Sequence, residues 1–279
     1  EAIRALQNRR QRYPVRGLMI EGEGRRFYPH RSLAGPLLGF VAPDGMGKEG
    51  VELALNRQLR GRAEEIRGLR DRAGRLIFAE GIQDEAALAG HNVVLTIDQG
   101  IQFIAERELE AALQTHEARH GSVLVLDPNT GEILAMANAP KYNPNDYNVS
   151  GSVQRRNRAT LDSFEPGSTF KVFAMAMALA SKSVRPTDSI YCEEGHMPID
   201  NVVIHDTHPS KWLSPTEIIQ VSSNIGMAKI ALGMGEAKLY EGLRRFGFGD
   251  PSGLPLPGNV SGTLRPRGRP WVPVETAAA

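Results

Sequence analysis

A serine and a lysine three positions apart form the pattern in this chain with the clearest chemical use. Residues 165–171 are Glu-Pro-Gly-Ser-Thr-Phe-Lys, and the proline and glycine stand directly before an apolar run. We expect a helix from Ser168 to about Leu179, whose positive N-terminal end favours an alkoxide. Residues three apart share a helix face, so a neutral Lys171, its pKa lowered by burial or nearby cations, can take the Ser168 proton. The pattern predicts an acyl-accepting serine.

A second polar motif lies 54 residues further along the chain. Ser222-Ser-Asn224 is the only Ser-x-Asn sequence present. Composition alone predicts about 0.4 chance occurrences of Ser-x-x-Lys and about 0.6 of Ser-x-Asn, so neither motif decides the matter by itself. Residues two apart on a helix point away from each other. Ser222 and Asn224 can therefore face one cleft only from a turn between helices.

Hydrophobic periodicity and turn signals indicate the elements around these motifs. A β-branched strand is expected at residues 91–98, followed by a helix at 99–113 and a hairpin at 121–136 around an Asp-Pro-Asn-Thr-Gly turn. Ser214-Pro-Thr-Glu217 is a capping box, so a helix starts there. Further helices are expected at residues 224–232 and 236–246. Helices beside a hairpin indicate an α+β fold.

The chain is long enough for two hydrophobic cores, and its texture changes near residue 90. Residues 1–90 are rich in Arg and Gly, with short apolar runs between turn signals, which indicates an irregular β-rich module. We expect one domain over 1–90 and a second over 91–279. The sequence begins at Glu1 without methionine and ends without a helix stop signal, so we interpret both ends as cut.

Composition argues against several classes of function. A formal net charge of +1 provides no field to attract nucleic acid. The lone Cys192 cannot form an internal disulfide, and the longest apolar run, residues 172–180, is far shorter than the roughly 20 residues of a membrane-spanning helix.

Both motifs, with their order and flanks, resemble the class B penicillin-binding proteins. The resemblance is carried by Phe164-Glu-Pro-Gly-Ser-Thr-Phe-Lys171 and by Ser222-Ser-Asn-Ile-Gly-Met-Ala-Lys229. Arg26-Phe-Tyr-Pro29 and Asp127-Pro-Asn-Thr-Gly-Glu-Ile-Leu-Ala-Met136 are similar to that family's pedestal and to the opening of its transpeptidase domain. The second string is most similar to division-specific members of the penicillin-binding protein 3 type.

The resemblance implies a fold and an incomplete site. The fold would be α+β: an N-terminally truncated β-rich pedestal over 1–90, then a transpeptidase domain over 91–279 with helices packed on an antiparallel sheet. The helix that begins at Ser168 would pack against that sheet. The family's third motif, Lys-Thr-Gly or Lys-Ser-Gly, does not follow Asn224. We therefore expect this chain to lack part of the oxyanion hole and of the carboxylate-binding groups.

The resemblance also implies residue roles. Ser168 would attack the penultimate D-Ala carbonyl of a peptidoglycan stem peptide, with Lys171 as acylation base and Ser222 relaying a proton to the leaving amine. Asn224 would bind the substrate amide, and Ser168 and Ser223 would contribute to substrate binding. The backbone N–H of Ser168 would form part of the oxyanion hole. β-Lactams would acylate Ser168 and remain attached.

By the same resemblance, the enzyme would cross-link the cell wall at the division septum, on the extracytoplasmic, periplasmic side of the bacterial inner membrane. An N-terminal membrane helix preceding Glu1 would anchor it. Its partners would be stem peptides, a lipid-linked precursor, β-lactam antibiotics, a membrane glycosyltransferase and other division proteins. We expect no cofactor, because acyl transfer needs only a nucleophile, a base and an oxyanion site.

Two alternatives to the transpeptidase stay open, and a metal site is weighed separately. A D,D-carboxypeptidase or β-lactamase would use the same serine and lysine with water as acceptor. A non-catalytic scaffold would bind division proteins through the pedestal. A metal site could draw on a set of polar residues between 192 and 208, but their spacing matches no structural zinc pattern and we expect no metal. That set is Cys192, Glu193, Glu194, His196, His205, Asp206 and His208.

Overall fold

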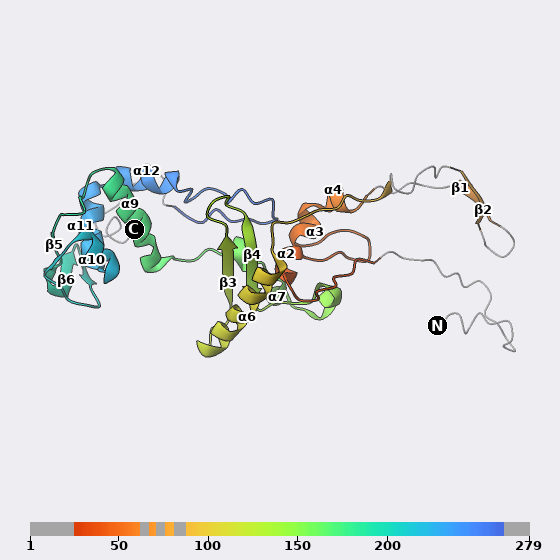
Figure 1. The fold of residues 1–279 in the computed structure, drawn as a ribbon, viewed down its shortest axis with the longest axis horizontal. Coiled ribbons are helices and arrows are strands. Elements are labelled where there is room, and N and C mark those ends of the chain that lie inside the picture. The colour runs from red at the N-terminus through yellow and green to blue at the C-terminus, as the bar shows by residue number, and fades with distance from the viewer. Residues whose placement is uncertain (1–24, 62–66, 71–75, 81–87, 265–279) are drawn as a thin grey trace. The chain divides into compact units, whose positions relative to one another are not determined.

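The computed structural model describes residues 25–61, 67–70, 76–80 and 88–264 (Figure 1). The chain divides into two compact units, unit 1 with residues 1–159 and unit 2 with residues 160–279. This division by contacts does not follow the predicted domain boundary near residue 90, which stays a prediction. Unit 1 extends past that point because Tyr28 exchanges hydrogen bonds with Asn145 over 2.9 and 2.8 Å.

The described residues before position 90 mix helix and strand, where the sequence predicted a β-rich module. Three short helices and one antiparallel hairpin lie there: α2 (Gly35–Leu38), α3 (Gly50–Ala54), α4 (Asn56–Leu59), β1 (Arg67–Arg70) and β2 (Leu76–Glu80). A single β-bridge joins Val41 to Gly47.

A long helix on a β-hairpin forms the core of unit 1 (Figure 1). Helix α6 (Gln99–Thr115) packs against β3 (Gly121–Leu126) and β4 (Ile133–Ala139), which pair antiparallel. Its buried side chains meet small alanines of β4, and this allows the helix to approach the sheet closely. The predicted helix and hairpin are confirmed, and both extend slightly beyond their predicted ends.

The prediction of a strand at residues 91–98 is wrong. This described segment is extended but forms no ladder, because only two of its groups bond to the neighbouring strand. The Thr96 hydroxyl donates to the Ile133 carbonyl over 2.6 Å, and the Asp98 N–H donates to the Leu134 carbonyl over 2.9 Å. Asp98 instead caps α6, where its carboxylate accepts the Ile101 N–H over 2.8 Å.

A buried polar network ties α6 to the rest of unit 1. Glu106 is nearly fully buried, and its carboxylate accepts the Ala34 N–H at 2.7 Å, the Gln102 amide at 2.8 Å and the Lys141 ammonium at 2.9 Å. Gln102 also bonds both main-chain groups of Met136 in β4. A buried carboxylate needs such donors, so the network fixes how these segments pack.

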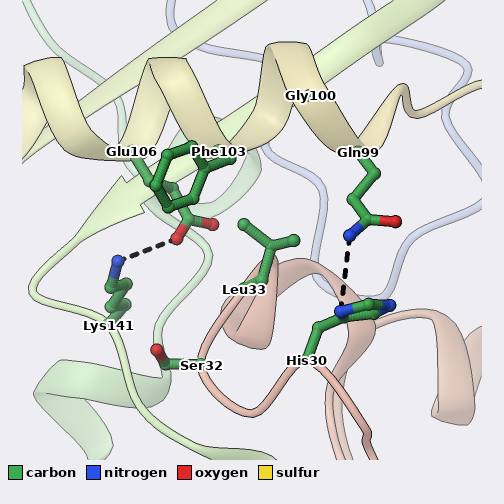
Figure 2. A pocket seen from close by; sticks show the side chains of 8 residues that line it. All are labelled: His30, Ser32, Leu33, Gln99, Gly100, Phe103, Glu106 and Lys141. Atoms are coloured by element: carbon green, nitrogen blue, oxygen red, sulfur yellow. Dashed lines mark hydrogen bonds and ion pairs between the residues drawn. The ribbon is translucent and has the colours of Figure 1, made fainter.

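Next to this network lies a pocket of about 600 Å³ (Figure 2). Figure 2 shows the Glu106–Lys141 ion pair on one side and the contact of Gln99 with His30 on the other, with Leu33 between them. All its lining residues belong to unit 1, and none is a predicted catalytic residue. The pocket is therefore not lined by the residues for which the sequence predicts catalysis.

Unit 2 is mainly helical, with two small antiparallel strand pairs. Strand β5 pairs with β8, and β6 pairs with β7. The elements are α9 (Lys171–Ala180), β5 (Ile190–Tyr191), β6 (His196–Ile199), β7 (Val202–His205), β8 (Trp212–Leu213), α10 (Pro215–Gln220), α11 (Asn224–Met234) and α12 (Glu236–Arg245). Two short helices, α7 (Ser152–Arg155) and α8 (Arg158–Leu161), precede them.

The four longer helices of unit 2 share one apolar core. Helix α9 contacts α10, α11 and α12, and the fully buried side chains at their contacts include Ile218, Ile225 and Leu243. The family resemblance implied that α9 packs on a sheet, but in the described part of unit 2 its main contacts are with helices. No helix in the described ranges has both the length and the apolar character needed to cross a bilayer.

The predicted capping box of α10 is confirmed. The Ser214 hydroxyl accepts the Glu217 N–H over 3.3 Å, and the Glu217 carboxylate accepts the Ser214 N–H over 2.7 Å. Two N–H groups at the start of the helix are thereby satisfied, and the box fixes where α10 begins.

Helices α10 and α11 approach most closely at a glycine. A Cβ atom on Gly226 would lie 2.5 Å from Cγ1 and 2.6 Å from Cδ1 of Ile218, which is fully buried. Gly233, in the same helix, has no atom within 4 Å of the corresponding position. Substitution by alanine therefore tests close packing and helix propensity together at Gly226, but helix propensity alone at Gly233.

We predict that Gly226→Ala lowers the free energy of unfolding, because overpacking of about 1–3 kcal/mol exceeds the helix-propensity gain of about 1 kcal/mol. Gly233→Ala should raise it by up to about 1 kcal/mol. Urea unfolding monitored by circular dichroism measures both. Equal stabilisation by the two substitutions would contradict the close approach at Gly226.

Candidate active site

Ser168 lies in a short 3-10 helix, Gly167–Phe170, that leads directly into α9. Gly167 has a φ of +59°, a left-handed conformation that glycine adopts without strain. The N–H of Lys171 donates to the Ser168 carbonyl, and side chains three apart eclipse in a 3-10 helix. Ser168 is exposed and shares a face with Lys171, at the start of the helix predicted from the sequence.

The amine of Lys171 joins the two motifs. Its Nζ donates to the Ser222 carbonyl at 2.6 Å, to the Ser222 hydroxyl at 3.0 Å and to Oδ1 of Asn224 at 2.7 Å. Three of the four predicted catalytic residues are thus in one hydrogen-bonded group. Within the part of the chain that the structure describes, the Ser168 hydroxyl makes no hydrogen bond. Ser168 is close to this group because it lies three residues before Lys171, one turn of the 3-10 helix away.

Ser222 is located in the turn between α10 and α11, as the sequence predicted. Its φ is +55°, a left-handed value that is uncommon for a residue other than glycine. Its N–H donates to the Ile219 carbonyl over 3.2 Å, which closes the turn. Because the chain reverses here, Ser222 and Asn224 both reach Lys171, which a regular helix would not allow.

Ser223 has a different environment from its two neighbours. It is almost completely buried and caps α11, where its hydroxyl accepts the Gly226 N–H over 2.9 Å. The same hydroxyl donates to Oδ2 of Asp206 over 2.6 Å. These bonds favour a structural role for Ser223, whereas its contact with substrate stays a prediction.

Asp206 is the residue of this region whose importance the sequence did not reveal. Its Oδ1 accepts the N–H of Asn224 at 2.5 Å and the N–H of Ile225 at 3.0 Å, at the N-terminus of α11. The carbonyl of the preceding residue, His205, accepts the side-chain amide of Asn224 at 2.8 Å. The end of β7 therefore fixes both the backbone and the side chain of Asn224.

Two opposing effects act on the charge of Lys171. Burial lowers the pKa of the Lys171 ammonium below the ordinary lysine value, and the negative charge of Asp206 raises it. Burial is the larger effect, so the pKa is lowered overall. A lowered pKa increases the neutral fraction that a proton acceptor requires.

The polar residues between 192 and 208 do not form a metal cluster. Across the described residues, no three histidine, cysteine or acidic side chains are positioned to hold one ion. Glu193 pairs with Lys229 at 2.5 Å, and Glu194 pairs with Lys211 at 3.3 Å. Cys192 is fully buried, and burial raises the pKa of its thiol.

Two family models match the chain. The penicillin binding protein transpeptidase domain matches residues 121–279, and the penicillin-binding protein dimerisation domain matches residues 1–95. The first range contains every predicted catalytic residue.

Curated proteins and solved structures agree with these models. The chain is 40% identical over 260 residues to the probable peptidoglycan D,D-transpeptidase PbpC of Pseudomonas aeruginosa, which covers 92% of this chain and 45% of that protein. It is 38% identical over 265 residues to the peptidoglycan D,D-transpeptidase FtsI of Escherichia coli K12, and this match covers 94% of this chain and 44% of FtsI. Penicillin binding protein 3 of Mycobacterium tuberculosis matches with a TM-score of 0.77 and 30% identity, over 90% of this chain and 53% of that one.

The chain spans less than half the length of these two curated relatives. Over that span the transpeptidase model alone covers more than half of the chain, and it includes the Ser168, Lys171, Ser222 and Asn224 positions described above. The chain belongs to the penicillin-binding protein transpeptidase family.

Proposed function

We propose that the protein containing this chain is a serine peptidoglycan D,D-transpeptidase that cross-links stem peptides through an acyl-enzyme on Ser168. One observation carries the proposal: the Lys171 amine, one 3-10 turn after the exposed Ser168, bonds to both the hydroxyl of Ser222 and the amide oxygen of Asn224. A nucleophile, a base and two substrate-directed polar groups are the parts that acyl transfer requires.

In the acylation step, Oγ of Ser168 attacks the penultimate D-Ala carbonyl, and neutral Lys171 takes the hydroxyl proton. A neutral amine keeps two N–H donors, enough for the Ser222 carbonyl and the Asn224 amide oxygen, and its lone pair accepts the proton. The C–N bond then breaks, Ser222 passes its hydroxyl proton to the leaving D-Ala amine, and the Lys171 ammonium returns a proton to Ser222 and is neutral again. The backbone N–H of Ser168 stabilises the oxyanion.

In the second step, an amine from a neighbouring stem peptide attacks the Ser168 ester. The ester C–O bond breaks, an amide forms, and the proton of the amine returns to Ser168 through Lys171. Asn224 holds the donor peptide amide in both steps. Water as acceptor gives a carboxypeptidase instead, so the acceptor amine distinguishes the two activities.

Location, partners and domain division belong to the same proposal. The enzyme works on the extracytoplasmic face of the cytoplasmic membrane, anchored by a helix that precedes this chain, beside a membrane glycosyltransferase and other division proteins. Residues 1–90 form the pedestal and 91–279 belong to the transpeptidase domain. The ranges of the two family models support this division.

Fluorescent penicillin tests the nucleophile and the base. In the full protein, Ser168→Ala should abolish covalent labelling, because no other group forms the ester. Lys171→Ala should slow labelling by about 10²–10⁴-fold, the usual contribution of a general base. Gel fluorescence over time measures both, and circular dichroism shows whether each variant is folded. Equal labelling of folded wild type, Ser168→Ala and Lys171→Ala would contradict the assignment.

The lifetime of the penicilloyl adduct separates the alternatives. A transpeptidase, whose acceptor is an amine, should keep the adduct for many minutes, whereas a β-lactamase, whose acceptor is water, releases it rapidly. Intact-mass measurement after removal of free penicillin follows the decay. Stable labelling together with unimpaired growth of cells that carry only Ser168→Ala would instead favour the scaffold alternative.

The charge of Asp206 should appear in the pH dependence of acylation. The acylation rate should rise with pH as Lys171 loses its proton. Asp206→Asn keeps an oxygen for the N–H groups of Asn224 and Ile225 but removes the charge that raises the Lys171 pKa. The rising limb should therefore shift to lower pH.

A second aspartate to asparagine change provides the control. Asp188 is a half-buried partner of the exposed Arg185 and is not among the groups that act on Lys171, so Asp188→Asn should leave the limb in place. Stopped-flow acylation measured from about pH 5 to about pH 11, which extends past the ordinary lysine pKa, follows the limb. A shift to higher pH in Asp206→Asn would refute the electrostatic assignment.

A further inference from the structure

Two histidines that are nine positions apart in sequence lie directly opposite each other in the β6–β7 hairpin. The register pairs His196 with His205, Met197 with Ile204, and so on to the turn. The imidazole centroids are 5.0 Å apart and the rings are perpendicular. The sequence placed both histidines in a set of seven candidate metal ligands but did not pair them, because only the hairpin register brings the two residues together.

The two histidines occupy a pair position with close side chains. Just beyond the ladder, the N–H of Asp206 donates to the Gly195 carbonyl over 3.1 Å, while the Gly195 N–H donates to the Cys192 carbonyl. Hydrogen-bonded and non-hydrogen-bonded positions alternate along an antiparallel pair, so His196 and His205 occupy a non-hydrogen-bonded position. The Cβ atoms are closest at these positions, about 4.5–5.5 Å apart, so both imidazoles can reach one point between them.

Both rings lie on the solvent face of the hairpin, and each has a ring nitrogen without a hydrogen bond among the described residues. Met197 and Ile204 face the core, whereas His196 and His205 are exposed. Nδ1 of His196 lies 3.4 Å from the Glu194 carbonyl, and donation there leaves Nε2 with its lone pair outward. The ring nitrogens of His205 have no hydrogen bond among the described residues.

The segment that carries the two histidines is acidic in sequence. Residues 193–206 contain four carboxylates and no lysine or arginine. Lysines from other segments neutralise Glu193 and Glu194, while Asp206 faces inward to the start of α11. No cationic side chain of the described residues is paired with either imidazole.

We propose that His196 and His205 together bind one divalent transition-metal cation of the zinc, nickel or copper class. Imidazole nitrogen is a preferred ligand of these ions. With two protein ligands the ion keeps open coordination positions for water, so the site is exchangeable, unlike a closed structural zinc site. It is distinct from the acyl-transfer group, which needs no metal.

Occupation of this site restrains the hairpin beside the active-site turn. The carbonyl of His205 holds the amide of Asn224, and Asp206 follows directly. A metal that bridges both strands prevents them from separating at this end. Amides of residues 196–206 should therefore exchange more slowly with deuterium when the ion is bound.

Isothermal titration of the tag-free protein with Zn²⁺ and with Ni²⁺ tests the proposal. Wild type should bind one ion at this site, and His196→Ala and His205→Ala should each bind it at least about tenfold more weakly, the lower end of what loss of a supporting residue alone costs. His208→Ala is the matched control, since His208 is an exposed histidine of the same unit outside the pair. It should bind as wild type does.

Hydrogen exchange with and without Zn²⁺ provides the second measurement, and thermal unfolding without metal shows whether each variant is folded. Zn²⁺ should protect residues 196–206 in wild type and in His208→Ala but not in His196→Ala. Undiminished affinity in folded His196→Ala and His205→Ala, an equal loss in His208→Ala, or unchanged exchange of the hairpin in wild type would each overturn the proposal.

Discussion

The Asp206 carboxylate at the N-terminus of α11 is the interaction on which the site geometry depends. It accepts two backbone N–H groups and the Ser223 hydroxyl, so one side chain satisfies donors that a helix start leaves without partners. Hydrogen bonds to a charged group contribute about 1.5–3 kcal/mol each. The left-handed backbone of Ser222 costs roughly 1–3 kcal/mol. The junction can therefore offset the strain that the turn introduces.

The same carboxylate opposes the chemistry that its geometry supports. It raises the pKa of Lys171, while burial lowers that pKa by more. Because three donors surround the Asp206 carboxylate, its field at the lysine is partly compensated. The residue thus builds the turn at a modest electrostatic cost to the neutral amine. Position, rather than charge, is its main contribution to the site.

Local features were predictable from sequence, and features that depend on distant partners were not. The capping box of Ser214 and Glu217 involves residues three apart, and the hairpin turn after residue 126 is equally local, so sequence patterns specify both. The strand expected at 91–98 failed because β-branched composition does not provide a partner strand. Propensity describes the segment itself, whereas a ladder needs two segments.

In the active site, too, sequence patterns predicted the local features but not the contacts between distant segments. The Ser-x-x-Lys pair and the turn between α10 and α11 follow from spacing, but only the resemblance to a known family brought the two motifs together across more than 50 residues. Sequence patterns named Asp206, His196 and His205 only as candidate metal ligands. The role of Asp206 at the start of α11 and the pairing of the two histidines arise from the register of β6 against β7 and from the contact with α11. No local pattern records either.

The last two residues of β7 and the residue that follows them have different environments, because side chains alternate across a strand. Ile204 packs on the core, His205 faces solvent, and Asp206 turns inward to α11. A slip of one residue would exchange all three environments. The two-residue turn sets the register, but a two-stranded hairpin alone is marginally stable, so the contacts of β7 with α11 stabilise the hairpin in this register. Since α11 in turn needs Asp206 at its start, the hairpin and the active-site turn should form and open as one cooperative unit.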